Sequence, residues 1–154
     1  MKFSHVDKNG LAQMVDISRK AVQLRKACAE GRLVVQQKTL DLLRKSSLPK
    51  GGPVETARLA GIQAAKRTSW LIPLCHDLNL DHIDVQIEVS KAGFQIHSVV
   101  VCRRATGVEM EALTAVTVAA LTLYDMCKAV DSKMKIEGIR LISKEKENLS
   151  APIR

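Results

Sequence analysis

Charged side chains lie at both ends of one long apolar segment, GVEMEALTAVTVAALTLYDMCKAVD, residues 107–131. Asp125 and Lys128 are three residues apart near its end, so on a helix they share one face and can act as a general acid and base. A simple ion pair on a solvated surface is the alternative, but the long uncharged run before them favours a pocket. Glu109 and Glu111 enter the segment at its start, where a helix dipole stabilises carboxylates.

The distance between the two ends of this segment limits what they can do together. On one straight helix the 14 residues from Glu111 to Asp125 span about 21 Å, so a small substrate does not touch both. Either the two ends serve different purposes, or a second subunit brings one end of its helix to the site at the other end. The segment offers more apolar surface than one helix face needs, which favours the second option and predicts a homo-oligomer.

The segment LIPLCHDL, residues 71–78, places His76 beside Cys75 in an apolar run. By itself this pair is compatible with a core histidine, half of a metal site or part of a catalytic pocket. A tetrahedral zinc site is not expected, because no CxxC pair occurs among the four cysteines, Cys28, Cys75, Cys102 and Cys127.

Cations suited to a phosphorylated ligand occur in and after a glycine-rich loop. Lys50 lies in PKGGP, and such loops present backbone N–H groups and a cation to phosphate. The loop is not a Walker A motif, because no GK[ST] follows at the required spacing, and a surface lysine is the ordinary alternative. Arg58, Lys66 and Arg67 extend the positive region, and Arg25 can add to it.

The charge balance of the whole chain also favours an anionic partner. The net charge is +8, from 24 Lys and Arg against 16 Asp and Glu. Only 3% of residues are aromatic, which disfavours stacking on nucleic acid and makes a polyphosphate the better expectation. A basic nucleic-acid-binding or scaffold module remains the alternative, and it should bind with a steep dependence on salt.

Nothing in the chain predicts a membrane partner. The start, MKFSHVDKNG, has no apolar h-region, so no signal peptide is expected. The longest apolar run, AVTVAALTL at 115–123, is too short to span a bilayer. Reduced cysteines in a cytoplasmic protein are the expectation.

The pattern of the chain predicts one α+β domain over residues 1–145, with helices covering one face of an antiparallel sheet, and a flexible tail over 146–154. Ser18 is expected to cap a helix over 19–31 that stops at Gly31. The other expected elements are a strand at 32–37, a helix at 38–46, a helix from Val54 that ends before Pro73, a hairpin of 82–89 with 94–102, the helix 107–131 and a strand at 135–145.

Two long stretches, TARLAGIQAAKRTSWLIPLCHDL and TGVEMEALTAVTVAALTLYDMCKAV, resemble the MoaC family of cyclic pyranopterin monophosphate synthases in molybdenum cofactor biosynthesis. MVDIS and IRLISK are also similar to the family, so the resemblance covers roughly residues 5–145. It implies a ferredoxin-like α+β fold and conversion of 3′,8-cyclo-7,8-dihydroguanosine 5′-triphosphate to cyclic pyranopterin monophosphate, with release of pyrophosphate. It also implies a hexamer, a trimer of dimers, with sites between subunits.

The resemblance assigns roles residue by residue. It implies that Asp125, Lys128 and Lys50 are catalytic. It implies that the substrate is bound by Leu74, Cys75, His76, Glu109, Met110, Glu111 and Arg25, and Lys66 and Arg67 suit its triphosphate. No metal ligands and no required cofactor are expected, and Mg²⁺ can assist. The chain departs from the family pattern at Gly52, Trp70, Asp77 and the C-terminal tail.

Overall fold

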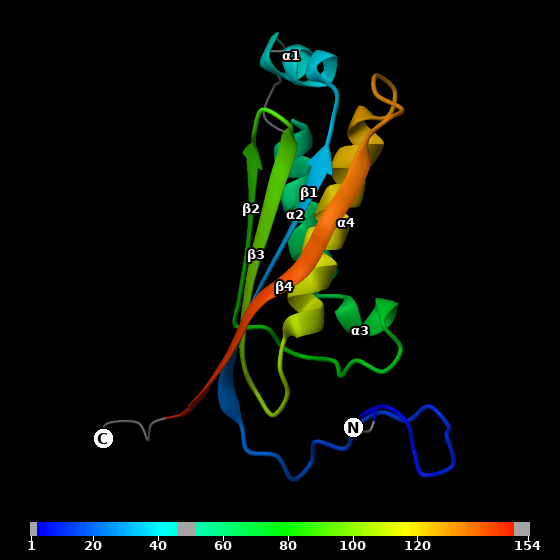
Figure 1. The fold of residues 1–154 in the computed structure, drawn as a ribbon. Helices are drawn as coiled ribbons and strands as arrows, with labels where there is room; N and C mark the ends of the chain where they lie inside the picture. Colours follow the sequence, from blue (N-terminus) through cyan, green and yellow to red (C-terminus); the bar gives the residue numbers. More distant parts are fainter. Residues whose placement is uncertain (1–2, 46–51, 150–154) are drawn as a thin grey trace, which may run out of the picture.

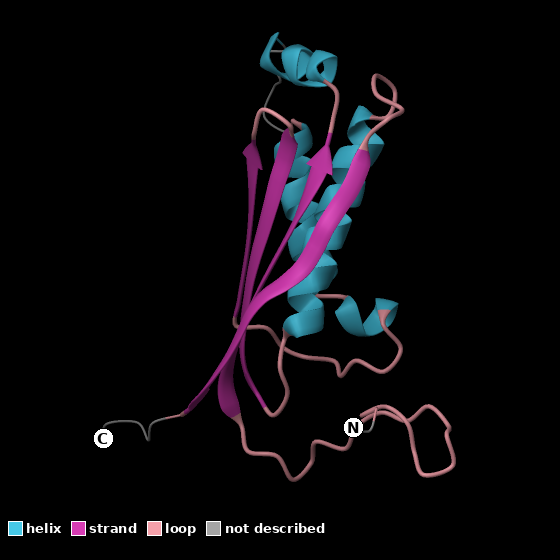
Figure 2. Ribbon diagram, viewed as in Figure 1, coloured by secondary structure: helices cyan, strands magenta, loops and turns pink. Residues whose placement is uncertain are grey.

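A four-stranded antiparallel sheet forms the centre of this computed structural model, which describes residues 3–45 and 52–149. The strands are β1 (Gln23–Val34), β2 (His82–Val89), β3 (Gly93–Arg104) and β4 (Lys135–Asn148), in the order β2-β3-β1-β4. Two long helices, α2 (Pro53–Ala65) and α4 (Glu109–Cys127), pack on one face of the sheet (Figure 1, Figure 2). Two short helices, α1 (Gln37–Lys45) and α3 (Thr68–Leu71), lie at opposite ends of the molecule. The prediction of an α+β, ferredoxin-like fold is confirmed.

The helix predicted for residues 19–31 is wrong, because most of this segment belongs to β1. That strand lies between β3 and β4 and pairs with both. Ala27, Ala29 and Leu33 are buried at every second position, the period of a strand with one covered face. Gly31, which was expected to stop a helix, lies under α4, where an added Cβ would come within 2.8 Å of a valine side chain. The segment alone fits both a helical repeat and a strand repeat, and its pairing with distant strands therefore determines that it forms a strand.

The remaining elements agree with the sequence pattern apart from their bounds. The hairpin is β2 and β3, the short helix is α1, the long apolar helix is α4 and the last strand is β4. The strand expected at 32–37 contributes only the end of β1. The helix expected from Val54 ends before Pro73, but it is interrupted after Ala65, so α3 is a separate turn of helix.

The last strand is longer than expected. β4 pairs with β1 as far as Asn148, so residues 146–148 do not belong to the loose tail predicted for 146–154. Residues 150–154 lie outside the described part of the chain. The extension matters because it brings Lys146 opposite Arg25, near the start of β1.

Small residues let α2 and α4 approach each other closely. Gly61 faces Ala115 and Ala119, and a Cβ added to Gly61 would lie 2.9 Å from the carbonyl oxygen of Ala115. The two helices run in opposite directions, so the end of α2 and the start of α4 lie at the same end of the sheet (Figure 1).

The helix α4 is long and apolar enough, by length and composition alone, to cross a membrane, and no other helix in the described ranges is. Half of it is buried within the protein, where Ala112, Val116 and Leu123 are completely enclosed. Such burial is typical of the central helix of a globular core.

A buried aspartate fixes the far end of α4 to the start of α1. The carboxylate of Asp131, 1% exposed, accepts hydrogen bonds from the backbone N–H of Gln36 at 2.7 Å and of Lys133 at 2.9 Å, and from the Thr39 hydroxyl at 3.1 Å. Burial acts to raise its pKa, but these hydrogen bonds hold the pKa of Asp131 below its ordinary value. The aspartate therefore satisfies free N–H and O–H groups of a distant helix terminus.

The surface of α3 carries the single tryptophan of the chain. Trp70 is 83% exposed, and the adjacent Leu71 is also exposed.

Candidate functional site

A cavity of about 410 Å³ opens at the end of the sheet where α4 begins. We call it the histidine pocket. Its walls come from the loop before β2, the segment leading into α4, strand β4 and His5. Six residues to which the family resemblance assigns substrate binding line this one cavity: Leu74, Cys75, His76, Glu109, Met110 and Glu111.

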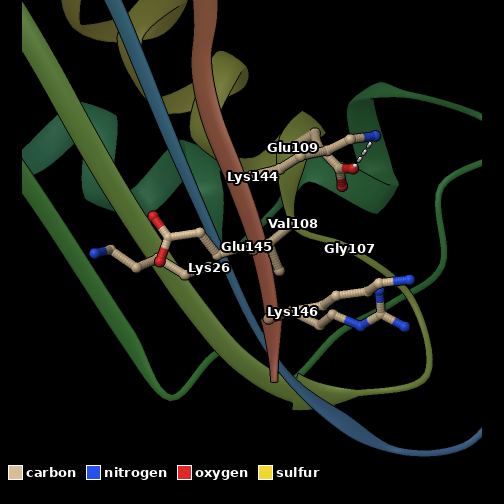
Figure 3. Close-up of a pocket in the computed structure, with 8 residues that line it drawn as sticks. Lys26, Gly107, Val108, Glu109, Lys144, Glu145 and Lys146 are labelled. Carbon is tan, nitrogen blue, oxygen red and sulfur yellow. Dashed lines mark ion pairs between the residues drawn. The ribbon is translucent and has the colours of Figure 1, made fainter. Parts of the chain in front are cut away.

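A second cavity, of about 230 Å³, lies beside the first between the start of β1 and the end of β4 (Figure 3). We call it the lysine pocket. It is lined by Arg25, Lys26, Gly107, Val108, Glu109, Lys144, Glu145 and Lys146. Four of these eight residues are cationic and two carry carboxylates, so the lysine pocket suits an anionic group.

The two cavities meet at three shared residues, Gly107, Glu109 and Lys144. Lys144 Nζ and Glu109 Oε1 are 3.2 Å apart and form an ion pair at this boundary (Figure 3). Gly107 leaves room for the pair, because a Cβ at that position would collide with the carboxylate of Glu109. Two cavities that share walls can hold two parts of one elongated ligand.

The lysine pocket contains an unsatisfied donor. Arg25 Nε is buried and has no hydrogen-bond partner. Lys146 lies directly opposite Arg25 in the pairing of β1 with β4. A buried donor without a protein acceptor costs free energy, so a ligand that supplies an acceptor there is favoured.

The histidine pocket contains a buried carboxyl group. Glu111 is 4% exposed, and burial raises its pKa to about 7. The hydrogen bond from its own backbone N–H opposes this increase, and the nearby charge of Glu109 adds to it. A carboxyl group with a pKa near 7 can hold or release a proton near neutral pH.

His76 and Cys75 contact the same space. His76 Nε2 is buried and has no hydrogen-bond partner, so it is a second unsatisfied polar atom at this end of the molecule. Burial raises the pKa of the Cys75 thiol, and the charge of Glu111 raises it further. Cys75 is therefore expected to line the pocket as a neutral thiol rather than to act as a nucleophile.

Asp125 and Lys128 lie at the opposite end of α4. Lys128 Nζ donates a 2.6 Å hydrogen bond to Asp125 Oδ1, and this interaction, with the charge of Asp125, raises the pKa of Lys128. The uncharged run before the pair favoured a pocket around it, but in the single chain 69% of the Asp125 side chain and 62% of the Lys128 side chain are exposed. Within one chain the pair and the histidine pocket are therefore separated by most of the length of α4.

Two further predicted cations, Lys66 and Arg67, are described by the structure but line neither pocket. They follow α2 and are exposed near the start of α4. Lys50 lies outside the described residues.

Sequence reasoning missed the two lysines of β4 that line the lysine pocket. Lys144 and Lys146 are two residues apart, so they point to the same side of the strand, toward the side chain of Arg25. The alternation in SKEKE is a usable signal for a strand with a cationic face, but the register with β1 is needed to place it.

In the part of the chain that the structure describes, no group of three or more His, Cys, Asp and Glu side chains is arranged to hold a metal ion.

Comparison with known proteins identifies relatives over nearly the whole chain. A family model described as the MoaC family matches residues 14–147. A "Cyclic pyranopterin monophosphate synthase" of Chloroflexus aggregans is 56% identical over 145 residues, covering 93% of this chain and 88% of the relative. The "Cyclic pyranopterin monophosphate synthase 3" of Mycobacterium bovis is 52% identical over 143 residues, covering 92% and 81%.

One further relative is longer. A "Molybdenum cofactor biosynthesis bifunctional protein" of Chlorobaculum tepidum is 56% identical over 141 residues, which cover 92% of this chain and 45% of that protein. The chain therefore spans less than half the length of this bifunctional relative.

Proposed function

This chain belongs to the MoaC family, and we propose that it is a cyclic pyranopterin monophosphate synthase of molybdenum cofactor biosynthesis. The substrate is 3′,8-cyclo-7,8-dihydroguanosine 5′-triphosphate, which is rearranged to cyclic pyranopterin monophosphate with release of pyrophosphate. The observation that carries the proposal, beside family membership, is that the two adjoining cavities differ in their lining. The lysine pocket is lined mainly by cations, and the histidine pocket by His76, Glu111 and several apolar side chains. Such a pair suits a ligand with a heterocycle at one end and phosphates at the other.

The phosphates are proposed to bind in the lysine pocket. Arg25, Lys144 and Lys146 supply charge-assisted hydrogen bonds to phosphate oxygens, and the buried Nε of Arg25 gains an acceptor. The same cations would stabilise the negative charge that accumulates on the departing pyrophosphate. The heterocycle then lies in the histidine pocket, against Glu111 and His76.

Proton transfer is assigned to Asp125 and Lys128, with Lys50 as a third catalytic residue. Because Asp125 and Glu111 are 14 residues apart on α4, about 21 Å, this assignment requires two subunits at each site. We propose a hexamer built from dimers, in which the far end of α4 from one subunit completes the pockets of another. The exposed Leu121, Met126 and Val130 give that end of the helix the apolar surface of an interface.

The proposal includes no resident cofactor and a cytoplasmic location. A Mg²⁺ ion that accompanies the phosphates would belong to the substrate, as is usual for phosphorylated ligands.

The direct test is incubation of the purified full chain with the cyclised dihydro-GTP while pyrophosphate is measured. Stoichiometric pyrophosphate with formation of the cyclic pterin is expected. A folded protein that leaves the authentic substrate intact contradicts the proposal. If the chain instead bound nucleic acid, with an affinity that falls steeply as salt rises, the alternative of a nucleic-acid-binding module would be supported.

A further inference from the structure

The chain begins with a small hairpin, residues 5–13, that is held together by its own hydrogen bonds. Val6 pairs with Ala12 across it, and backbone hydrogen bonds of 2.9 and 3.0 Å flank this pair. The carboxylate of Asp7 accepts two more, of 2.8 Å each, from backbone N–H groups at the turn. Gly10, with a φ of 83°, supplies the left-handed residue of the turn. We call this unit the N-terminal hairpin and expect it to move as one piece.

The N-terminal hairpin is only weakly attached to the rest of the protein. As far as the described ranges go, every hydrogen bond of residues 3–22 joins two residues of that same segment. The segment also exposes several large apolar side chains: Phe3, Val6, Leu11 and Met14. A unit with internal order but few contacts to the body opens and closes at low cost. Residues 14–22 therefore provide a connection about which the hairpin can rotate.

One face of the N-terminal hairpin is directed at the histidine pocket. His5 lines that cavity together with Leu74 and Cys75. Side chains of a hairpin alternate between its two faces, so His5 and Leu11 share one face and Val6 lies on the other. The face that reaches the pocket therefore also carries an uncovered leucine, which is 66% exposed.

A second exposed apolar surface lies close to the same pocket. Trp70 and Leu71 on α3 are 83% and 55% exposed. Leu74, a wall of the pocket, follows Leu71 by only three residues, so their Cα atoms are at most about 11 Å apart. The N-terminal segment and α3 also lie at the same end of the molecule (Figure 1). Contact between the two surfaces would remove apolar area from water on both.

We propose that the N-terminal hairpin is a lid of the histidine pocket, which closes over a bound ligand and buries Leu11 against Trp70 and Leu71. The inference rests on the proposed function only for the identity of that ligand. Closure would exclude water from the space around Glu111 and would retain the ligand during the reaction. His5 lies on the closing face, so it is carried over the ligand.

A disulfide tests whether the hairpin reaches α3. Leu11→Cys combined with Leu71→Cys should form an intrachain disulfide under mild oxidation, because the closed lid brings these side chains into contact. Leu11→Cys combined with Val89→Cys is the matched control and should form none. Val89 is similarly exposed but lies at the end of β2 away from the pocket. Gels without reductant separate intrachain from interchain bridges, and peptide mass spectrometry identifies the bridged residues. If no bridge forms, or only one between chains, the lid is wrong.

The fluorescence of Trp70, the only tryptophan, tests whether a ligand closes the lid. Saturating the full chain with GTP at a fixed protein concentration should shift the emission to shorter wavelength and reduce quenching by acrylamide. Leu11→Ser should still bind GTP in calorimetry, but it should lose most of the shift and release GTP at least about 10-fold faster. Val89→Ser should behave as the wild type. An unchanged spectrum with GTP bound, or a full shift in Leu11→Ser, would overturn the lid.

The outcomes distinguish the lid from the proposed function. If the intrachain bridge between positions 11 and 71 forms but the wild type releases no pyrophosphate from the cyclised substrate, the lid stands and the function is wrong. If pyrophosphate is released and that bridge does not form, the function stands and the lid is wrong.

Discussion

Lys144 and Glu109 form an ion pair of 3.2 Å at the boundary between the two pockets. The lysine therefore reaches both the region proposed for phosphates and a carboxylate beside the proposed ring. Its side chain is 69% exposed, so the pair is expected to contribute little to the stability of the fold.

Replacing Lys144 should weaken phosphate binding without lowering the stability of the fold. Lys144→Gln is expected to lower the affinity for a purine triphosphate about 10-fold and the affinity for a monophosphate much less. The melting temperature should be almost unchanged. Calorimetry at two salt concentrations measures this, and the variant should show a shallower salt dependence. Arg32→Gln is a matched control, because Arg32 pairs with Glu137 away from both pockets. Equal weakening of both nucleotides would show that Lys144 does not contact the outer phosphates.

The Asp125–Lys128 pair provides a test of catalysis without destabilisation. Both side chains are exposed in the single chain, so Asp125→Asn and Lys128→Ala should fold normally and assemble. Each is expected to lower kcat by at least about 100-fold, the usual effect of losing a positioned acid or base. Turnover measurements together with circular dichroism check this. If either variant keeps a near-normal rate, the assigned role is wrong and the pair is a surface ion pair.

Mixing two inactive chains tests whether each site uses two subunits. His76→Ala removes a residue of the histidine pocket, which opens where α4 begins, and Asp125→Asn removes one near the end of α4. After subunit exchange, mixed assemblies should recover part of the activity, because some sites then receive an intact half from each chain. A mixture that stays inactive after confirmed exchange would place both residues in one subunit. An active monomer in sedimentation would contradict the oligomer itself.

The buried carboxyl of Glu111 should make stability depend on pH. Its pKa is raised from 4.5 to about 7, so between these values the folded protein holds a proton that the unfolded chain has released. The contribution of Glu111 to the free energy of unfolding should therefore be fully present below the lower value and should be lost as pH rises through the upper one, by on the order of 3 kcal/mol.

The same titration predicts that Glu111→Gln gains stability relative to the wild type as pH rises. Urea unfolding of both proteins at about pH 5 and about pH 8 measures the difference. The charge of Glu109 acts on this group, and the thiols of Cys75 and Cys102 lie near it, but all three residues remain present in both proteins. Glu137→Gln, at a partly exposed position away from both pockets, should show no such trend. A constant difference between wild type and Glu111→Gln at both pH values would contradict the assigned titration.

Asp131 should be important for stability although it contacts neither pocket. Asp131→Ala removes an acceptor for Gln36, Thr39 and Lys133, and the loss is expected to be about 3 kcal/mol in urea unfolding. Asp131→Asn keeps one acceptor oxygen and should lose less. Because the pKa of Asp131 is lowered in the folded protein, its contribution should be present above its unfolded pKa and lost as pH falls below it. An Ala variant as stable as the wild type would show that α1 is held by other contacts.

Local sequence patterns predicted the helices and the hairpin well, because their periods and their Pro and Gly boundaries are encoded within each segment. The same reasoning failed for β1. Its Ala27 and Cys28 also fit a helical repeat, and only pairing with β3 and β4 selects the strand.

The features of the site also differ in how far the sequence alone predicts them. The shared helix face of Asp125 and Lys128 follows from spacing alone, and their 2.6 Å hydrogen bond agrees with it. Bringing His76 next to Glu111 requires the tertiary fold, and the sequence supplied that neighbourhood only through a family resemblance. Lys144 and Lys146 could not be placed at all without the register of β4, because their partner Arg25 is more than a hundred residues away.

The exposed position of Trp70 has a spectroscopic consequence. The only indole of the chain lies on the surface of α3, so its emission should already resemble that of a water-exposed fluorophore in the folded single chain. Unfolding of the core would then scarcely change the fluorescence, and circular dichroism would be the better signal for melting curves. Conversely, a shift of the emission toward shorter wavelength on raising the protein concentration would report that another surface covers α3.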